Sequence, residues 1–372
     1  MTSDELSLAQ ELCRLSGRCY AIATGRGATA IYIGLRAAGL SAARVVVPGT
    51  ICSAAVCPII YSGNEPVFCD VELSDLNVGV ARVREALLGG AECAIIPHAY
   101  GHAARIGEIA SACAEHGAML VEDAASALGA TPDGRLAGSW GSFSVFSFGY
   151  AKVVDAGIGG ALLTDERGLF RAARRELARL PERTAEHSIR SASLGHILRG
   201  WLNARRAEPR LDAMMQPVWS HYSDVHLLRL GTDDHSRIAD RLPSLPAALE
   251  ARSRNADLYD RLLGAGDVDL FRPQPRPGSV CWRYTLLLPP LLRDTVVDSM
   301  RGAGVDVSTL YPSAQRLFGD MTSPELPNCR EVENRAINLW ASPDLTDQDI
   351  ARNVTVLRDA MARVRAQLGD PK

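Results

Sequence analysis

Two residues near the middle of the chain, Asp123 and Lys152, have types and positions suited to chemistry on a carbonyl group. Asp123 ends a short apolar run, Met119–Asp123, which is typical of a buried parallel strand, and ligands of open α/β sheets bind at the carboxyl ends of such strands. Lys152 follows a second predicted strand, Ser142–Phe148, in a mostly apolar loop. Desolvation in that setting lowers the pKa of an amine and leaves more of it as the free nucleophile.

Together, Asp123 and Lys152 are the two groups that pyridoxal phosphate requires: an amine for a Schiff base, and a carboxylate that keeps the pyridine nitrogen protonated. Each alone has an ordinary interpretation. A lysine after a strand is commonly a solvated loop residue, and Glu122-Asp123 is commonly a helix cap or a metal or hydroxyl ligand. The pair therefore indicates the cofactor only together with a phosphate site and a suitable fold.

A glycine-containing turn, Thr24–Thr29, supplies a candidate phosphate site because it precedes a predicted helix, Ala30–Leu40. Free backbone N–H groups and the positive end of the helix dipole favour an anion there. We expect the phosphate on Gly27, Ala28 and Thr29, with the Thr29 hydroxyl as an additional donor. An ordinary tight turn is the alternative interpretation.

Strands and helices alternate over the first 123 residues with short connections. The predicted strands are Cys19–Ala23, Arg44–Val47, Pro66–Asp70, Cys93–Pro97 and Met119–Asp123, and the predicted helices are Ser7–Leu15, Ala30–Leu40, Cys52–Tyr61, Ala81–Leu88 and Ala104–His116. This alternation predicts an α/β fold in which helices flank a mostly parallel sheet.

The second half of the chain predicts a smaller domain. Residues 167–210 indicate an arginine-rich helical segment, which is either a solvated face or a site for an anionic substrate or partner. The elements expected after it are a helical connector over Arg229–Tyr259 that is interrupted near Pro243 and Pro246, strands Trp282–Leu288 and Ile337–Leu339, and helices Leu291–Gly302 and Asp347–Leu368. We predict a large domain over residues 1–239 and a small C-terminal α+β domain over residues 240–372.

The composition is that of an ordinary globular protein. The 372 residues are 47% hydrophobic and 22% charged, and the net charge of -3 gives no reason to expect nucleic acid or membrane partners. Nine cysteines without a Cys-x-x-Cys spacing favour reduced thiols in a cytoplasmic compartment, so we expect neither disulfides nor a metal site. No apolar run approaches the roughly 20 residues of a membrane helix.

Several short motifs in order resemble the DegT/DnrJ/EryC1/StrS family of fold-type I pyridoxal-phosphate enzymes, which are mostly sugar and aminocyclitol aminotransferases. The motifs that carry the resemblance are Pro66–Val71, His98–Gly101, Glu122–Ala125, Ser147-Phe148 with Lys152, Gly159–Ala161 and Leu345–Asp347. The resemblance spans about Ala21 to Leu368. It implies the fold-type I architecture, pyridoxal 5'-phosphate as cofactor, and a homodimer with shared active sites.

The resemblance also implies roles for single residues. Lys152 corresponds to the Schiff-base lysine that also moves the proton, Asp123 to the partner of the pyridine nitrogen, and Ser147 to a phosphate ligand.

Three departures concern the cofactor site. Ala28 replaces the threonine that usually starts the helix, with Thr29 next to it. Ser126 stands where the family usually carries a glutamine, which alters contact with the ring, and Cys52 lies where an aromatic side chain often packs on it.

Four further residues are candidates for the substrate site. His98 lies near the ring, or else is a buried histidine bonded to the backbone. Tyr150 and Tyr311 are loop residues that would edge the pocket, and Arg229 matches a family position near the neighbouring subunit's phosphate.

We therefore expect an aminotransferase with glutamate or glutamine as donor and a keto-sugar, keto-cyclitol or related secondary-metabolite intermediate as acceptor. One alternative, motivated by Ser126, is an elimination, replacement or decarboxylation of an amino-acid-derived substrate. Another is a non-enzymatic, cofactor-binding regulatory subunit. Lys152 together with Asp123 argues against this last role, because a scaffold needs neither residue.

Overall fold

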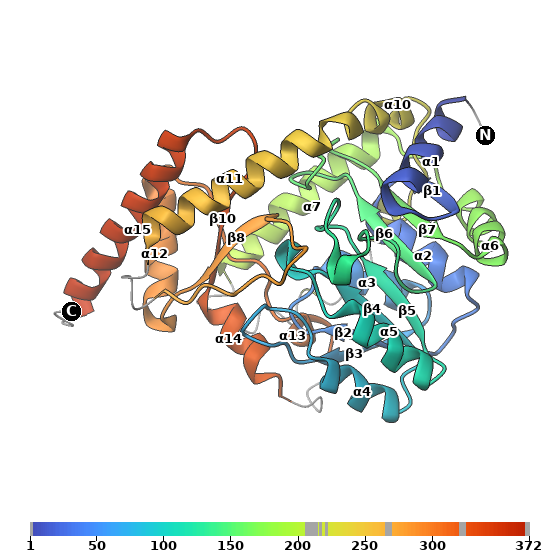
Figure 1. Ribbon diagram of the computed structural model, residues 1–372, viewed down its shortest axis with the longest axis horizontal. Helices are drawn as coiled ribbons and strands as arrows, with labels where there is room; N and C mark the ends of the chain where they lie inside the picture. The colour runs from blue at the N-terminus through green and yellow to red at the C-terminus, as the bar shows by residue number, and fades with distance from the viewer. Residues whose placement is uncertain are drawn as a thin grey trace.

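The protein is built on two β-sheets (Figure 1). The computed structural model describes residues 3–204, 215, 218–219, 222–264, 270–319 and 325–368. The larger sheet has seven strands in the order β1-β7-β6-β5-β4-β2-β3. Their bounds are β1 Tyr20–Thr24, β2 Arg44–Pro48, β3 Glu65–Cys69, β4 Cys93–Pro97, β5 Met119–Asp123, β6 Phe143–Ser147 and β7 Gly160–Thr164. Strands β2 to β6 run parallel, whereas β7 is antiparallel to both of its neighbours. The predicted mostly parallel sheet is confirmed.

Helices cover both faces of the larger sheet, as the alternation predicted. The helices on one face are α2 Gly27–Ala37, α3 Ser53–Tyr61 and α6 Arg167–Ala178; those on the other are α1 Ser3–Ser16, α4 Val80–Leu88 and α5 Ile106–Glu115. Strand β6 is buried on both sides, because Phe143 and Val145 pack in the first layer while Phe146 packs in the second. This packing holds the carboxyl ends of β5 and β6 next to each other.

The smaller sheet is antiparallel and lies at the other end of the molecule (Figure 1). Its strands are β8 Arg283–Leu287, β9 Val307–Ser308 and β10 Ala336–Trp340, and the helices packed on it are α11 Leu245–Leu263, α12 Pro290–Gly302 and α15 Asp347–Leu368. Long helix α11 connects this region to the larger sheet, and the fold-type I α/β class is confirmed. A domain boundary near residue 240 stays a prediction.

The connector after residue 229 differs from its prediction. Helix begins only at α10 Asp234–Ala239, so the expectation of helix from Arg229 is wrong. The interruption near Pro243 is confirmed, but Pro246 does not interrupt a helix. It lies in the first turn of α11, where a missing N–H costs no helical hydrogen bond.

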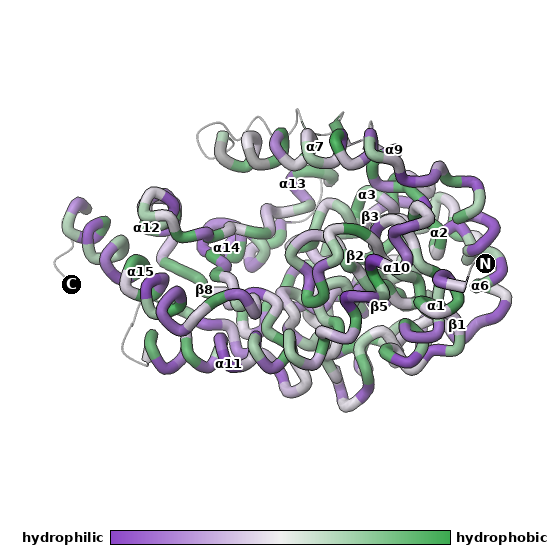
Figure 2. The backbone as a smooth tube through the Cα atoms, turned by 90° about the horizontal axis from the view of Figure 1, so that it is seen from above, coloured by the Kyte–Doolittle hydropathy of each residue, from purple (hydrophilic) through white to green (hydrophobic). Residues whose placement is uncertain are grey.

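Helix α7 Ala185–Ala204 runs along one edge of the molecule (Figure 2). Its hydrophobic and hydrophilic residues form no single stripe, and Ile189 and Ile197 are exposed. The predicted arginine-rich segment is divided between α6 and α7, and its Arg205 and Arg206 lie outside the described residues. The remaining helices are α9 Ser223–His226, α13 Ala314–Phe318 and α14 Pro327–Arg335. Among the described helices, none combines the length and hydropathy needed to cross a membrane.

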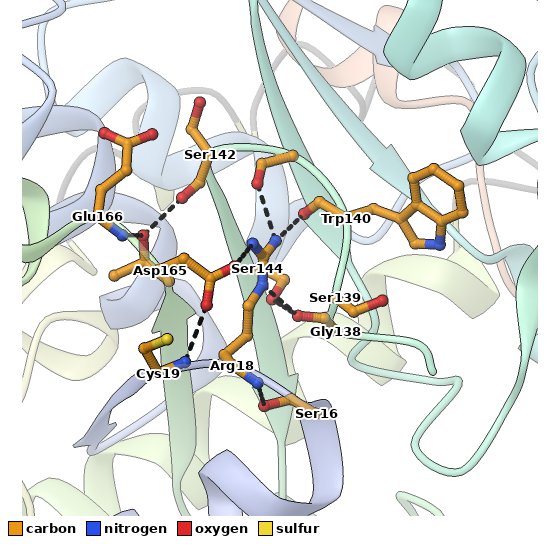
Figure 3. A network of polar contacts seen from close by, with 12 residues as sticks. Ser16, Arg18, Cys19, Gly138, Ser139, Trp140, Ser142, Ser144, Asp165 and Glu166 are labelled. Carbon is orange, nitrogen blue, oxygen red and sulfur yellow. Dashed lines mark hydrogen bonds and ion pairs between the residues drawn. The ribbon is translucent and has the colours of Figure 1, made fainter. Parts of the chain in front are cut away.

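A buried arginine, Arg18, ties three segments of the large sheet together (Figure 3). Its Nε donates to the Gly138 carbonyl at 2.9 Å, and its Nη1 donates to the Asp165 carboxylate at 2.8 Å. Its Nη2 donates to the carbonyls of Trp140 and Gly141. We call these contacts the Arg18 network; they join the segment before β1 to the loop before β6 and to the end of β7.

Candidate active site

Strand β5 ends in two carboxylates that point in opposite directions, because successive strand residues alternate between faces. Glu122 is completely buried and accepts hydrogen bonds from the Trp140 N–H at 2.8 Å and from the His98 ring at 2.9 Å. Asp123 instead lines a cavity, where it accepts the Ala125 N–H at 3.0 Å. Of the two acids, only Asp123 is therefore placed to meet a ligand.

Lys152 lies in the loop between β6 and β7, and this loop has a defined conformation. Ala151 has φ +65°, a left-handed conformation that an alanine adopts only when its surroundings impose it. The Asp155 carboxylate accepts the N–H groups of Ala151 and Gly157, each at 2.7 Å. The indole N–H of Trp282 donates to the Ala151 carbonyl at 2.6 Å. Side-chain hydrogen bonds thus fix the backbone on both sides of Lys152.

The amine of Lys152 points back toward β5. Its Nζ donates to the Ser126 hydroxyl at 3.0 Å and lies 4.8 Å from the centroid of the Trp282 ring. Burial lowers the pKa of Lys152, and the nearby Cys52 and Asp123 oppose that shift in part. Burial likewise raises the pKa of Asp123, with the lysine charge acting in the opposite direction. A desolvated amine beside a carboxylate is suited to form a Schiff base.

A cavity of about 650 Å³ brings most of the predicted site residues together. The predicted residues that line it are Gly27, Ala28, Cys52, His98, Asp123, Ser126, Ser147, Tyr150, Lys152 and Tyr311. Thr29 and Arg229 are not brought to its wall.

The Thr29 hydroxyl is turned away from the cavity. It donates to the His226 carbonyl at 2.8 Å and accepts the Leu228 N–H at 3.2 Å, in a fully buried position. The Thr29 hydroxyl, which we expected to donate to the phosphate, therefore holds the 226–228 segment against α2 instead.

Arg229 also has a structural position. Its Nε donates to the Leu180 carbonyl at 2.9 Å, and its Nη2 lies 3.7 Å from Glu182. These contacts hold the segment after α6, so the structure does not place Arg229 in the substrate site of its own chain.

One end of the cavity is formed by the first turn of α2, where the phosphate was predicted. This helix begins at Gly27, so the N–H groups of its first residues have no partner within the helix and face the cavity end of β6, where Ser147 lies. Strand β7 passes close to the same turn: a Cβ added to Gly160 would lie 2.4 Å from the Gly27 nitrogen. Only a glycine at position 160 allows this approach. The neighbouring Arg26, which the sequence analysis did not single out, also lines the cavity.

His98 is held rigidly in the cavity wall. The Ala104 N–H donates to its Nδ1 at 3.0 Å, so the proton lies on Nε2 and is donated to Glu122. Both ring nitrogens are thus occupied by the protein. His98 can offer its ring face to a ligand, and stacking on the cofactor stays a prediction.

The remaining predicted residues differ in exposure. Tyr150 is 78% exposed at the rim, with its ring edge-on to Trp340 at 6.3 Å, whereas Tyr311 is partly buried with its ring 5.6 Å from Tyr100. Burial raises the pKa of Tyr311 well above its ordinary value. Cys52 is exposed as a residue, but desolvation at the cavity wall raises the pKa of its thiol, which favours the neutral form.

A sequence model described as the DegT/DnrJ/EryC1/StrS aminotransferase family matches residues 3–196 and 237–358. This chain belongs to that family. A relative from Saccharopolyspora spinosa, dTDP-4-dehydro-2,3,6-trideoxy-D-glucose 4-aminotransferase, is 28% identical over 309 residues, which are 82% of this chain and 75% of the relative. GDP-perosamine synthase of Caulobacter vibrioides is 35% identical over 348 residues, covering 91% and 85%.

The solved structures support the same fold. A DegT DnrJ EryC1 StrS aminotransferase from Brucella abortus matches with a TM-score of 0.77 at 22% identity, covering 96% of this chain and 90% of that one. The chain is an aminotransferase, and pyridoxal phosphate is its cofactor. The donor set fits that group, because an enclosed amine, a carboxylate at a strand end and a helix N-terminus line one cavity.

Sequence reasoning missed three residues on the far side of the Lys152 loop: Arg252, Trp282 and Arg283. Buried Arg252 donates to the Trp282 carbonyl at 3.0 Å and to the Lys152 carbonyl at 3.3 Å. These residues come from α11 and the start of β8, more than 90 positions after the lysine. The one available signal was an arginine within an otherwise uncharged strand, Arg283 in Arg-Tyr-Thr-Leu-Leu.

Proposed function

We propose that this aminotransferase moves an amino group from glutamate or glutamine to a ketone on a sugar or cyclitol. The observation that carries the proposal is the enclosure of Lys152 and Asp123 in one cavity with the first turn of α2. The chain contains only two lysines, Lys152 and Lys372, so there are few candidates for a Schiff base. The named activities of the relatives, on nucleotide-linked sugars, support the acceptor class.

Each residue of the site has a role in this reaction. When bound, pyridoxal phosphate would supply an electron sink for the substrate carbon that loses its proton. The Lys152 amine takes the proton from that carbon and later returns one, and Ser126 orients the amine. Asp123 would keep the pyridine nitrogen protonated. Ser147 and the first N–H groups of α2 would hold the phosphate.

The mouth of the cavity suits an acceptor rich in hydroxyl groups. Beyond the cofactor end, the wall includes polar side chains from the segment before α7 and from α7 itself: Arg183, His187, Ser188, Ser191 and His196. Such groups provide hydrogen bonds that orient a polar ligand. These residues come from a different part of the chain than the loop that carries Lys152. They can therefore select the acceptor without altering the position of the reacting amine.

We propose further that the enzyme is a homodimer. Exposed Ile189 and Ile197 on α7 support an interface at this edge of the molecule, since large exposed apolar side chains next to a binding site are often covered by a partner. Sedimentation equilibrium of the purified protein tests this point: twice the chain mass supports it, and the mass of one chain contradicts it.

Absorbance spectroscopy tests the proposed reaction. Adding L-glutamate or L-glutamine to the cofactor-loaded protein should replace the absorbance of the lysine-bound cofactor with that of its amine form. One equivalent of the 2-oxo acid should be released. A keto-sugar nucleotide or a keto-cyclitol should then restore the original spectrum. If no amino acid produced the amine form, or if ammonia were released without it, the proposal would be wrong.

A further inference from the structure

Arg26 immediately precedes helix α2 and carries a charge that has no counterion in the described chain. It lines the cavity, where the other arginine of the wall, Arg183, pairs with Asp234 at 3.0 Å. Asp123 is the one acidic residue among the described residues of the wall, and it lies near Lys152. An enclosed cation without a counterion is costly, and an anionic ligand lowers that cost.

The backbone of Arg26 is held in place by its neighbours. The Thr24 hydroxyl donates to the Arg26 carbonyl at 2.8 Å, and the Gly159 N–H donates to the Gly25 carbonyl at 3.1 Å. Arg26 is extended, and its side chain forms no capping hydrogen bond with α2. The stem of this arginine therefore begins at a fixed position beside the first turn of α2, and it does not occupy the N–H groups of that turn.

The guanidinium of Arg26 is oriented by helix α7. Its Nη2 donates to the Ser191 hydroxyl, and Ser191 lines the same cavity. Burial lowers the pKa of Arg26, and the nearby charge of Arg183 lowers it further. Because a guanidinium has five N–H donors, the bond to Ser191 leaves donors for a ligand.

Other side chains at this end of the cavity offer little to a phosphate. Ala28 has no donor, and the Thr29 hydroxyl is bonded to the 226–228 segment. Ser147 does lie against the turn, since a Cβ added to Gly27 would be 3.5 Å from the Ser147 Cβ. A helix N-terminus supplies roughly half a positive charge, whereas a phosphate monoester carries about two negative charges near neutral pH. A further positive group at this end would therefore strengthen phosphate binding.

We propose that the Arg26 guanidinium binds the phosphate of the cofactor, an inference that rests on the placement of that phosphate at the first turn of α2 in the proposed function. The arginine stem begins at the residue before that turn, and the planar donors of a guanidinium match the oxygens of a phosphate. Ser191 is then a positioning residue, because its hydroxyl holds the guanidinium without contacting the phosphate itself.

The competing role for Arg26 is binding of an anionic acceptor, as a residue of the cavity mouth. Arg183 is in that position, but its Nη1 and Nη2 donate to Asp234 and to Ser188. The two roles differ in what they predict for the cofactor-free protein, since only a phosphate ligand changes the affinity for the phosphorylated ring.

The test measures binding of two probes to the cofactor-free protein: 4-deoxypyridoxine 5'-phosphate and 4-deoxypyridoxine. Both lack the aldehyde, so neither forms a Schiff base with Lys152, and they differ only in the phosphate. Calorimetric titrations compare the wild type, Arg26→Gln and Arg26→Lys with the control Arg36→Gln. Arg36 lies in the last turn of the same helix, away from the cavity, where its Nε is 3.8 Å from Glu176.

The wild type and Arg36→Gln should bind the phosphorylated probe more tightly than the other probe. Arg26→Gln should weaken binding of the phosphorylated probe by roughly 10- to 100-fold, the loss expected for hydrogen bonds between charged groups, and leave the other probe unchanged. Arg26→Lys should fall between, because it keeps the charge and loses the planar donors. Ser191→Ala should weaken the phosphorylated probe less than Arg26→Gln does, because the charge remains.

Equal weakening of both probes by Arg26→Gln would assign Arg26 a structural role and overturn the inference. An Arg26→Gln variant with the wild-type preference for the phosphorylated probe would also overturn it, in favour of the acceptor. If Arg26→Gln did not fold, Arg26→Lys would decide: a preference equal to that of the wild type would overturn the inference. Neither probe takes part in amino transfer, so a wild type that binds both as expected but fails to convert with amino donors contradicts the proposed function alone.

Discussion

Arg18 and Arg283 are both buried arginines, but their surroundings differ in kind. In the Arg18 network all three guanidinium nitrogens donate to protein oxygens, one of them a carboxylate. Arg283 is held between two aromatic rings, and two of its nitrogens have no partner in the described chain. The first arrangement satisfies every guanidinium nitrogen, whereas the second leaves two of them without a partner among the described residues.

This contrast separates a buried arginine that holds the fold through satisfied hydrogen bonds from one whose hydrogen bonds are partly unmade. The Arg18 network lies in the large sheet, away from the cavity, and links segments more than 100 residues apart. Arg283 belongs to a cluster at the junction of the two sheets, together with Lys152, Arg252 and Trp282. The positive charges in that cluster repel one another. Burial lowers the pKa of Lys152 and of Arg283; the charge of Arg283 lowers the first further, and the charge of Arg252 lowers the second further. Loss of the satisfied Arg18 should therefore lower the free energy of unfolding more than loss of the unsatisfied Arg283.

The largest expected effect is on the rate of Lys152→Ala. We expect amino transfer to fall by roughly a thousandfold or more, because the variant loses the group that moves the proton. Its free energy of unfolding should not fall, since the change removes a buried cation. Single-turnover absorbance measurements and urea unfolding check the two halves of this prediction. A variant that retained most of its rate would remove Lys152 from the mechanism.

The largest expected effect on stability belongs to Arg18→Ala. The change leaves buried carbonyls of the network without donors and should lower the free energy of unfolding by about 3 kcal/mol, while donor affinity in the folded fraction stays unchanged. Arg14→Ala is the matched control, because Arg14 is exposed and pairs with the partly exposed Glu11 one helical turn away, so no measurable change is expected. Urea unfolding checks both. An equally small effect of the two substitutions would contradict the structural role assigned to Arg18.

A smaller effect concerns the pH dependence of the cofactor-free protein. Because burial lowers the pKa of Lys152 below its ordinary value of 10.5, the folded chain binds fewer protons than the unfolded chain between the two pKa values. In that window Lys152 makes stability rise with pH, with a slope of at most about 1.4 kcal/mol per pH unit. Lys152→Met removes this contribution. Urea unfolding at several pH values should show a flatter curve for the variant, and identical curves would mean that the pKa of Lys152 is not lowered.

The smallest expected effect is on the stability of Arg283→Met. Replacing an unpaired buried charge with an apolar side chain of similar length should leave the free energy of unfolding unchanged or raise it by about 1 kcal/mol. Thermal unfolding of the cofactor-free Arg283→Met and Arg18→Ala variants, measured side by side, checks this prediction. A loss as large as that of Arg18→Ala would mean that Arg283 holds the fold as Arg18 does.

The sequence was sufficient to predict the parts of the fold that depend on local patterns. Strands β4 and β5 and helix α15 have the predicted bounds, and most other elements differ by one to three residues. The reversed direction of β7 was not predicted, because a strand's hydrophobic pattern is the same in either direction. The helix expected from Arg229 was wrong because that segment is fixed by long-range contacts with Leu180 and Pro181, which no local pattern reveals.

The same distinction between local patterns and long-range packing applies to the candidate site. Asp123 ends β5 and Lys152 lies in the loop that follows the neighbouring parallel strand β6, so their meeting in one cavity followed from the topology of a parallel sheet. The sequence did not predict the direction of the Thr29 side chain in the first turn of α2. Its hydroxyl points to the 226–228 segment instead of the cavity. Trp282 and Arg283 could not be associated with Lys152 from the sequence, because they reach it only through the packing of the small sheet against the large one.

The most direct test of this account is to reduce the cofactor-loaded protein with borohydride and map the labelled peptide by mass spectrometry. Few primary amines compete for the label, since the only other lysine is Lys372. We predict stoichiometric pyridoxyl label on Lys152. Label on Lys372, or a fully loaded protein that took up none, would contradict the assignment of Lys152 on which the proposed reaction depends.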